Sequence, residues 1–333
     1  MKYWTRTVAM LSKGLNRRDF LKKSLVCSGA VTSALSLEEK ALLAAPTSNQ
    51  TTAPRSDSAN VLPVGKIGNV RISRLILGGN LINGYAHDRD LIYVSDLLKA
   101  YFTDEKIMET FELCEELGVN TVVLHTGNNP NVDSFRVINK YRNERGGNIQ
   151  WIAEAHPTSK DLTTNIKRAI DNGVVGAYIM GVIGDRWVRS GRLDLIDKVV
   201  GFIKENGLIA GVGGHSIDVP IQCEKAGIKA DFYMKTLHSH KYWSARIQPE
   251  HDNIWSRTPE KTIEFMKTVK KSWIAFKVLA AGAIHPREGF RHAFENGADF
   301  ICVGMYDFQA REDAIIAKDI LSGNLKRQRP WSA

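Results

Sequence analysis

The sequence predicts an α/β fold of the (β/α)8 or TIM-barrel class, preceded by a β-hairpin that closes the barrel bottom. Three observations carry this prediction. Six times a helix-like stretch ends at a glycine and is followed by an apolar strand. Two further apolar strands complete a series of eight. Residues 62–325 hold all of these units, which is the length of one such barrel.

The expected strands are short and apolar and are bounded by glycine or polar turns, as buried strands of a parallel sheet are. In chain order they cover 74–79, 121–126, 149–156, 176–181, 208–215, 231–238, 273–280 and 299–306. Because the strands of such a barrel all run the same way, their C-terminal ends meet on one face. The chemistry of TIM barrels takes place there.

Helical periodicity and caps place the helices between these strands. Thr103 and Asp104 begin the first, in which Ile107, Phe111 and Cys114 recur at the helical period. The others are expected at roughly 131–145, 161–172, 193–206 and 218–226, and from 258, 286 and 307 onward. Three remaining connections, 80–102, 181–192 and 239–257, are expected to be long loops on the face that carries the strand ends.

Two short alternating runs flank Ile67, Gly68 and Asn69 and predict a β-hairpin over 64–73. The hairpin is followed by the strand Arg-Leu-Ile-Leu-Gly-Gly at 74–79. This arrangement resembles the start of the aldo/keto reductases. The resemblance extends over 62–325 and implies a shared barrel architecture.

The reductase family places an Asp at the end of its second strand with a Tyr just after it, a Lys at the end of the third and a His at the end of the fourth. Here the second strand ends in His-Thr-Gly at 125–127, the third in Glu-Ala-His at 154–156 and the fourth in Met-Gly at 180–181. The reductase tetrad is not retained. The resemblance therefore implies the fold, with NADP-dependent hydride transfer kept as an alternative.

Residues 1–45 are expected to be a targeting segment. The run Asn-Arg-Arg-Asp-Phe-Leu-Lys at 16–22 closely resembles the twin-arginine export signal, and a modestly apolar run over 24–37 follows it. That run is too short and too rich in small residues to be a stable membrane span. The resemblance implies export through the twin-arginine translocase, to the periplasm or otherwise out of the cytoplasm. Residues 46–60 are expected to be a disordered linker and 61–333 the catalytic barrel domain.

The formal charge of +9 does not indicate a nucleic-acid partner. The segment 1–45 carries eight Lys or Arg and three Asp or Glu, so the remainder is close to balance, with 37 basic and 33 acidic side chains. The barrel sequence shows no stripe of basic residues interleaved with aromatics. We expect a small-molecule substrate.

Several chemically active side chains stand at the ends of predicted strands. They are His125, Glu154, His156, His215 and His238. Imidazole and carboxylate groups suit zinc, manganese or iron, so Glu154, His215 and His238, with His156 or His125, are candidate metal ligands. Without a metal, the same groups could serve as general acid and base. Both interpretations stay open.

Lys277 is expected to lie inside the seventh strand, between Ala275 and Leu279 on one face. A charged lysine is costly to bury there, so its pKa should fall. It is a candidate to stabilise an oxyanion or enolate, to form a Schiff base, or to pair with Glu154 across the barrel.

The long loops and the last two strand ends supply candidate binding groups. Trp187, Trp243 and Tyr242 offer flat aromatic faces, and Arg186 offers a forked donor, which together suit a sugar-like or anionic ligand. Packing of the loops is the competing explanation. Gly282 and Gly304 lie in glycine turns after the last two strands, where many barrels bind a phosphate or another anion.

These observations together predict an exported barrel enzyme acting on a small sugar-like or hydroxy-carbonyl substrate. Glu154, His156, Lys277 and His125 are the candidate catalytic residues. Isomerisation, epimerisation, elimination and hydrolysis all suit such a site. The alternatives are an aldo/keto-reductase-like oxidoreductase and a non-catalytic carbohydrate-binding protein that uses the Trp-rich loops.

Overall fold

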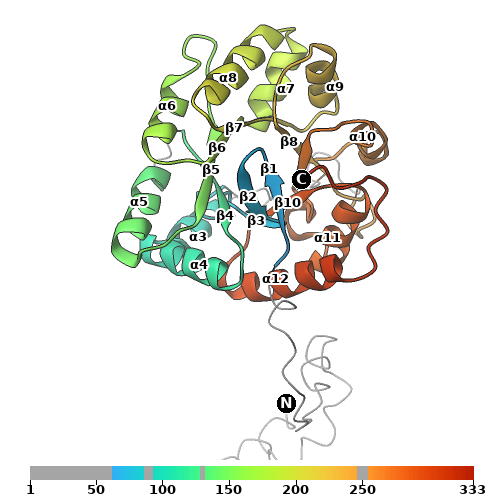
Figure 1. Cartoon of the computed structure of the whole chain (residues 1–333). Coiled ribbons are helices and arrows are strands. Elements are labelled where there is room, and N and C mark those ends of the chain that lie inside the picture. The colour runs from blue at the N-terminus through green and yellow to red at the C-terminus, as the bar shows by residue number, and fades with distance from the viewer. Residues whose placement is uncertain (1–61, 86–92, 128–131, 246–253) are drawn as a thin grey trace, which may run out of the picture. The chain divides into compact units, whose positions relative to one another are not determined.

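The computed structural model describes residues 62–85, 93–127, 132–245 and 254–333. Within them, eight parallel strands close into a barrel in the order β10-β3-β4-β5-β6-β7-β8-β9, and the helices form a ring around it (Figure 1). The strands are β3 (Leu75–Gly78), β4 (Thr121–His125), β5 (Gln150–Ala155), β6 (Gly176–Ile179), β7 (Ile209–Gly214), β8 (Phe232–Thr236), β9 (Ser272–Phe276) and β10 (Phe300–Val303). The predicted (β/α)8 barrel is confirmed.

In the described residues each strand of the barrel is followed by one α-helix, or by two after β3 and after β6. The helices are α3 (Val94–Tyr101), α4 (Asp104–Glu116), α5 (Ser134–Arg145), α6 (Thr164–Asp171), α7 (Gly181–Arg189), α8 (Leu193–Glu205), α9 (Asp218–Lys225), α10 (Pro259–Met266), α11 (Pro286–Glu295) and α12 (Asp307–Ser322). Two of them correct the sequence analysis, because α3 and α7 occupy segments that we expected to be loops. α7 forms although it carries two glycines, Gly181 and Gly184.

The apolar residues form two layers, as alternation along the strands requires. Inward-facing side chains such as Ile152, Tyr178 and Phe232 fill the barrel interior. Outward-facing side chains pack against the helix ring, and Trp151 and Trp273 are completely buried there. The barrel interior is thus packed below its C-terminal mouth.

The hairpin expected over 64–73 is present as β1 (Val64–Ile67) and β2 (Val70–Ser73), which pair antiparallel. Gly68 takes a left-handed backbone in the turn, with φ 55°, a conformation that glycine adopts without strain. Ile67 and Ile72 belong to the same buried cluster as the barrel interior. The hairpin therefore lies across one end of the barrel, as Figure 1 shows.

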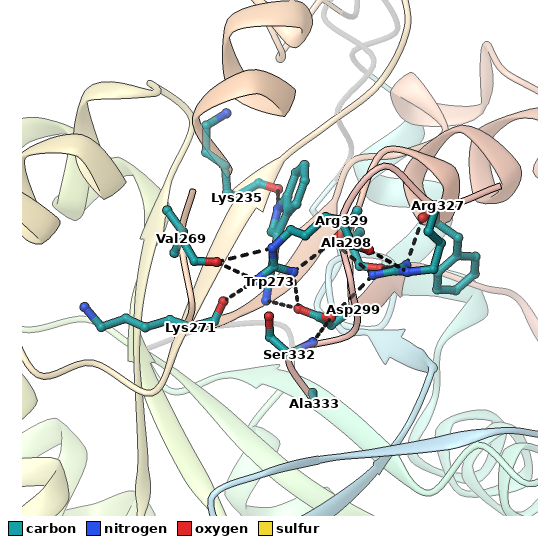
Figure 2. A network of polar contacts seen from close by, with 12 residues as sticks. Lys235, Val269, Lys271, Trp273, Ala298, Asp299, Arg327, Arg329, Ser332 and Ala333 are labelled. Atoms are coloured by element: carbon teal, nitrogen blue, oxygen red, sulfur yellow. Dashed lines mark hydrogen bonds and ion pairs between the residues drawn. The ribbon is translucent and has the colours of Figure 1, made fainter. Parts of the chain in front are cut away.

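The C-terminal segment is fixed to the same region by a buried network of charges (Figure 2). Arg329 Nη1 donates to Asp299 Oδ2 at 2.7 Å, and the two side chains are 2% and 0% exposed. Other donors of Arg329 reach the backbone carbonyls of Val269, Lys271 and Gly297. Since every charge in the network has partners, its burial is compatible with a stable fold.

The described residues contain no helix long and apolar enough to cross a membrane. The expected targeting segment 1–45 and linker 46–60 lie outside the described part of the chain. Both assignments remain predictions from the sequence.

Candidate active site

A cavity of about 320 Å³ opens at the C-terminal ends of the strands. Residues from β3 to β6 and from β8 to β10 line it, together with segments that follow several of these strands. Among the lining residues are Tyr85, Glu154, Tyr178, Trp255, Lys277, Cys302 and Gly304. A second, more open hollow of about 560 Å³ contains His125 and His156, and Tyr85 borders both. The mouth of the barrel thus combines an apolar pocket with a polar group of side chains.

Glu154 is the carboxylate of this pocket, near the end of β5. The Tyr178 hydroxyl donates to its Oε2 at 2.6 Å, and His156 Nε2 lies 3.5 Å from its Oε1. Burial alone would raise the pKa of Glu154, but the contacts with His156 and Tyr178 outweigh burial and lower it. The carboxylate is therefore ionised at neutral pH and able to accept a proton.

His125 and His156 lie against each other beside Glu154, with ring centroids 3.8 Å apart. His125 Nδ1 accepts a hydrogen bond from the backbone N–H of Gly127 at 3.0 Å. Burial, together with the neighbouring His156, lowers the pKa of His125 to about 4. The ring is therefore neutral at neutral pH, and its remaining proton is on Nε2, where it can be donated.

His125, Glu154 and His156 form the one cluster of potential metal ligands among the described residues, with their ligand atoms within 4.8 Å of one another. The 3.5 Å between His156 Nε2 and Glu154 Oε1 is close to the roughly 3.4 Å that separates two ligands on a tetrahedral ion. His156 Nε2 is buried without a hydrogen-bond partner in the described structure. These two residues fit a metal. His125 fits less well, because the Gly127 N–H occupies Nδ1 and leaves the proton on Nε2.

The structure does not bring together the expected ligand set of Glu154, His215 and His238. His238 is completely buried, and its Nε2 accepts hydrogen bonds from the backbone N–H groups of Trp255 and Ser256 at 3.0 and 2.9 Å. Its Nδ1 lies 3.0 Å from the carbonyl oxygen of Ser239. Both ring nitrogens are therefore engaged by the backbone. His238 holds the chain at 255–256 in place and has no lone pair left for a metal.

His215 lies just after β7 and pairs with a residue that the sequence analysis missed. Its Nδ1 is 2.8 Å from Asp185 Oδ2, and Asp185 is on α7. The His215 ring contacts Trp255 and Phe276, with centroids 5.9 and 5.4 Å away, and both of these line the cavity. Asp185 could not be recognised without knowing that 181–189 is a helix packed on β7.

Lys277 lines the cavity, but its environment corrects our expectation. β9 ends at Phe276, so Lys277 is outside the strand, half-buried, with its Nζ 3.4 Å from the centroid of the Trp255 ring. Its φ of 58° is left-handed, as are those of Ala280 at 46° and Ala281 at 56°. Three such non-glycine residues in one short segment store backbone strain, which is typical of ligand-binding turns. Gly282 and Gly304 line the same side of the cavity.

The buried lysine of the barrel is Lys235 in β8, which is 2% exposed. Its Nζ donates to the backbone oxygen and the hydroxyl of Thr236, and burial lowers its pKa to about 7. The burial of Lys235 could have been predicted from the alternation along β8, because Lys235 is on the same face of the strand as the buried Tyr233.

The four aromatic and arginine side chains expected to bind substrate do not line either described hollow. Trp187 is 4% exposed and packs in the outer core on α7, since residues 181–189 form a helix with an apolar face. Arg186 is exposed on the same helix. Trp243 is 86% exposed, and Tyr242 contacts the His238 ring at 6.4 Å. Trp255 and Tyr85 supply the aromatic lining instead.

No protein-family model and no curated protein matches this sequence. Among solved structures, a protein described provisionally as an aldo-keto reductase of Pseudomonas aeruginosa is similar in two structures. They have TM-scores of 0.54 and 0.53 and identities of 15% and 14%, and each match covers 79% of this chain and 98% of the other. A DAHP synthase of Thermotoga maritima matches with a TM-score of 0.47 and 13% identity, over 78% of this chain and 73% of the other. At such identities the likeness to the reductase shows that this chain shares its (β/α)8 barrel fold.

Proposed function

We propose that this chain is an enzyme that moves protons on a small, polyhydroxylated substrate with a carbonyl group. The single observation that carries the proposal is the ionised Glu154 carboxylate, held by Tyr178 at 2.6 Å and lining the cavity at the barrel mouth. A carboxylate in this setting can remove a proton from the carbon next to a carbonyl. Isomerases, epimerases and lyases share this first step.

The remaining groups would stabilise the negative charge that forms on the carbonyl oxygen. The neutral His125 would donate its Nε2 proton, and the Lys277 ammonium would attract the charge from the β9 side of the cavity. Tyr85 and Trp255 would cover the apolar faces of a sugar-like substrate. Gly304 would place its backbone N–H near an anionic substituent, whereas the N–H of Gly282 already donates to the carbonyl oxygen of Leu279 at 3.0 Å.

The test uses a panel of aldoses, ketoses and hydroxy acids incubated with the protein in heavy water. Mass spectrometry follows deuterium incorporation into carbon, and a thermal-shift assay follows binding. The wild type should incorporate deuterium into the compounds that it binds, and Glu154→Gln should bind them without exchange. Compounds that bind and exchange equally with both proteins, or bind to the wild type without exchange, would contradict the proposal. The second result would favour a non-catalytic carbohydrate-binding protein.

A metal-assisted form of the same reaction is the second candidate, and the 4.8 Å cluster of His125, Glu154 and His156 favours it. A bound divalent ion supplies polarisation of the carbonyl. Glu154 and His156 would hold it, and His125 could join them if its ring released the Gly127 N–H. Metal analysis of protein purified without chelator should find stoichiometric zinc, manganese or iron, and His156→Ala should lose it. Protein without stoichiometric metal would remove this form.

An NADP-dependent oxidoreductase is kept as an alternative because the reductase fold is shared. A thermal-shift assay with NADPH decides it, since a dinucleotide that binds the folded state must raise the melting temperature. An unchanged melting temperature with NADPH would discard the oxidoreductase alternative.

We also propose that the protein acts outside the cytoplasm, on the basis of the twin-arginine-like run at 16–22. The variant with Arg17→Lys and Arg18→Lys keeps the charge and should stay in the cytoplasm when cells are fractionated. Equal export of this variant and the wild type would refute the assignment.

A further inference from the structure

We infer that Asp185 and His215 form a second proton-transfer pair at the barrel mouth, so that the reaction is an isomerisation or an epimerisation. This inference rests on the proposed function, because it gives Glu154 a partner. Glu154 is on β5 and His215 follows β7, so the two groups approach the mouth from different strands. The His215 ring contacts Trp255 and Phe276, which line the cavity together with Glu154.

The pair is held in one geometry by hydrogen bonds from the backbone. Asp185 Oδ1 accepts from the N–H groups of His215 and Ser216 at 3.0 and 2.9 Å, while Oδ2 faces His215 Nδ1 at 2.8 Å. Burial alone would raise the pKa of Asp185, but the hydrogen bonds from His215 and Ser216 lower it. An ionised Asp185 can only accept a hydrogen bond, so the proton of the neutral His215 ring is on Nδ1 and donates to Asp185 Oδ2. The lone pair of the neutral ring is then on Nε2.

Two glycines make this approach of α7 to β7 possible. A Cβ on Gly184 would lie 2.1 Å from the carbonyl oxygen of Gly213, and one on Gly181 would lie 3.0 Å from His215 Cε1. Larger residues at these positions would push the helix, and Asp185 with it, away from His215. The glycines that weaken α7 as a helix therefore allow the pair to form.

His215 does not itself line either hollow, but it lies directly behind the lining residues Trp255 and Phe276 and can exchange protons with solvent. Its side chain is 20% exposed, and in the described structure its Nε2 makes no hydrogen bond. His215 also lies outside the one group of three potential metal ligands among the described residues. An imidazole oriented by a carboxylate, with a free Nε2, is the arrangement of a general acid and base.

With His215 as a second proton-transfer group beside Glu154, the proton chemistry is that of an isomerase or an epimerase. Glu154 removes a proton from carbon, the C–H electron pair becomes the enolate, and the negative charge develops on the carbonyl oxygen. In an isomerisation, the Nε2 lone pair of His215 takes the proton of the neighbouring hydroxyl and returns it to the former carbonyl oxygen, and Glu154 returns its proton to the former carbonyl carbon. One C–H and one O–H bond are broken and one of each is formed, so both groups are restored and no oxidant or reductant is needed. In an epimerisation, His215 first takes up a solvent proton on Nε2 and gives it to the same carbon from the opposite face, while Glu154 releases its proton to solvent.

The pair is tested without a substrate, by carbethoxylation of histidine with diethyl pyrocarbonate and mass spectrometry of the peptides. We expect His215 of the wild type to react at pH 7 at least about tenfold faster than His238, whose two nitrogens are both hydrogen-bonded. Asp185→Asn should slow His215 several-fold, because Asn no longer fixes the tautomer or supplies the charge. The amide oxygen of Asn can still accept the backbone N–H bonds, so the fold should be kept. Nitrogen-15 NMR of the imidazole reports the tautomer in both proteins.

Glu154→Gln separates this inference from the proposed function, since it should abolish deuterium exchange while His215 still reacts at the wild-type rate. A His215 that reacts no faster than His238 would overturn the pair. So would an Asp185→Asn variant whose His215 keeps both its tautomer and its rate. If His215 behaves as expected but Glu154→Gln leaves exchange intact, the pair stands and the proposed role of Glu154 fails.

Discussion

The Tyr178 hydroxyl donates a 2.6 Å hydrogen bond to Glu154 Oε2 inside the barrel mouth. Tyr178→Phe removes this donor, so the pKa of Glu154 should rise from its lowered value. The ionised Glu154 stabilises the fold above its unfolded pKa, and this contribution is lost as the pH falls through the folded pKa. In Tyr178→Phe the stabilising contribution of Glu154 should therefore be lost at a higher pH than in the wild type. Deuterium exchange should also begin to fall at a higher pH as the solution is made more acidic.

Tyr233→Phe is the matched control for that prediction. The Tyr233 hydroxyl donates to Glu224 Oε1, also at 2.6 Å, but the tyrosine is buried in the outer core. Each variant should lose about 1–3 kcal/mol of unfolding free energy, as removal of a hydrogen bond to a charged acceptor does. Only Tyr178→Phe should move the exchange profile. An unmoved profile would show that Glu154 does not limit exchange.

Protonation of His238 should loosen the chain that carries Trp255. Burial lowers the pKa of His238 to about 4, below the unfolded value of about 6.5, so the fold favours the neutral ring. This contribution is complete above pH 6.5 and is lost as the pH falls from there toward 4. It amounts to about 3 kcal/mol. Urea unfolding across this range should show a shallower decline for His238→Gln than for the wild type. Equal declines would refute the role of this histidine.

Lys235→Met should stabilise the protein at neutral pH. Burial lowers the pKa of Lys235 to about 7, so the fold favours the uncharged amine. Wild-type stability should therefore fall as the pH drops from about 10.5 toward 7, and the variant should lack this fall. After the loss of the bonds to Thr236, a net gain of about 2–4 kcal/mol at pH 7 is expected. The exposed Lys229→Met should change little. A destabilised Lys235→Met would show that the lysine is charged and paired.

Arg329→Ala should destabilise the fold by about 3–5 kcal/mol, because it leaves the buried Asp299 carboxylate without its closest cation. The exposed Lys326→Ala should stay within about 0.5 kcal/mol of the wild type. Denaturation in urea measures both. Ligand binding at the mouth should be unchanged in Arg329→Ala, and an altered affinity would show that the network also shapes the cavity.

Local patterns were sufficient to predict the strands, most helices and the hairpin, because a glycine cap and an apolar strand are each recognised within a few residues. α7 was missed because Gly181 and Gly184 lower its helix propensity, and the reason for them is contact with β7. Asp185 was missed for the same reason, because its pairing with His215 depends on the packing of α7 against β7.

Side-chain roles at the mouth could be predicted only in part. His125, Glu154 and His156 could be placed together because β4 and β5 pair with His125 opposite Glu154. His238 could not be assigned, since its partners are backbone groups seventeen and eighteen residues later in the chain. Lys277 was misplaced because the end of β9 is set by left-handed backbone at residues that rarely adopt it.

The contact between Arg74 Nη2 and the carbonyl oxygen of Ala333 joins positions 259 residues apart, and β3 pairs with β10 beside it. Ring closure must therefore wait until β10 has been synthesised. Until then β3 presents an unsatisfied edge that other chains could join. We expect nascent chains lacking 325–333 to depend on chaperones, and truncation there to cause aggregation before it affects any chemistry at the mouth.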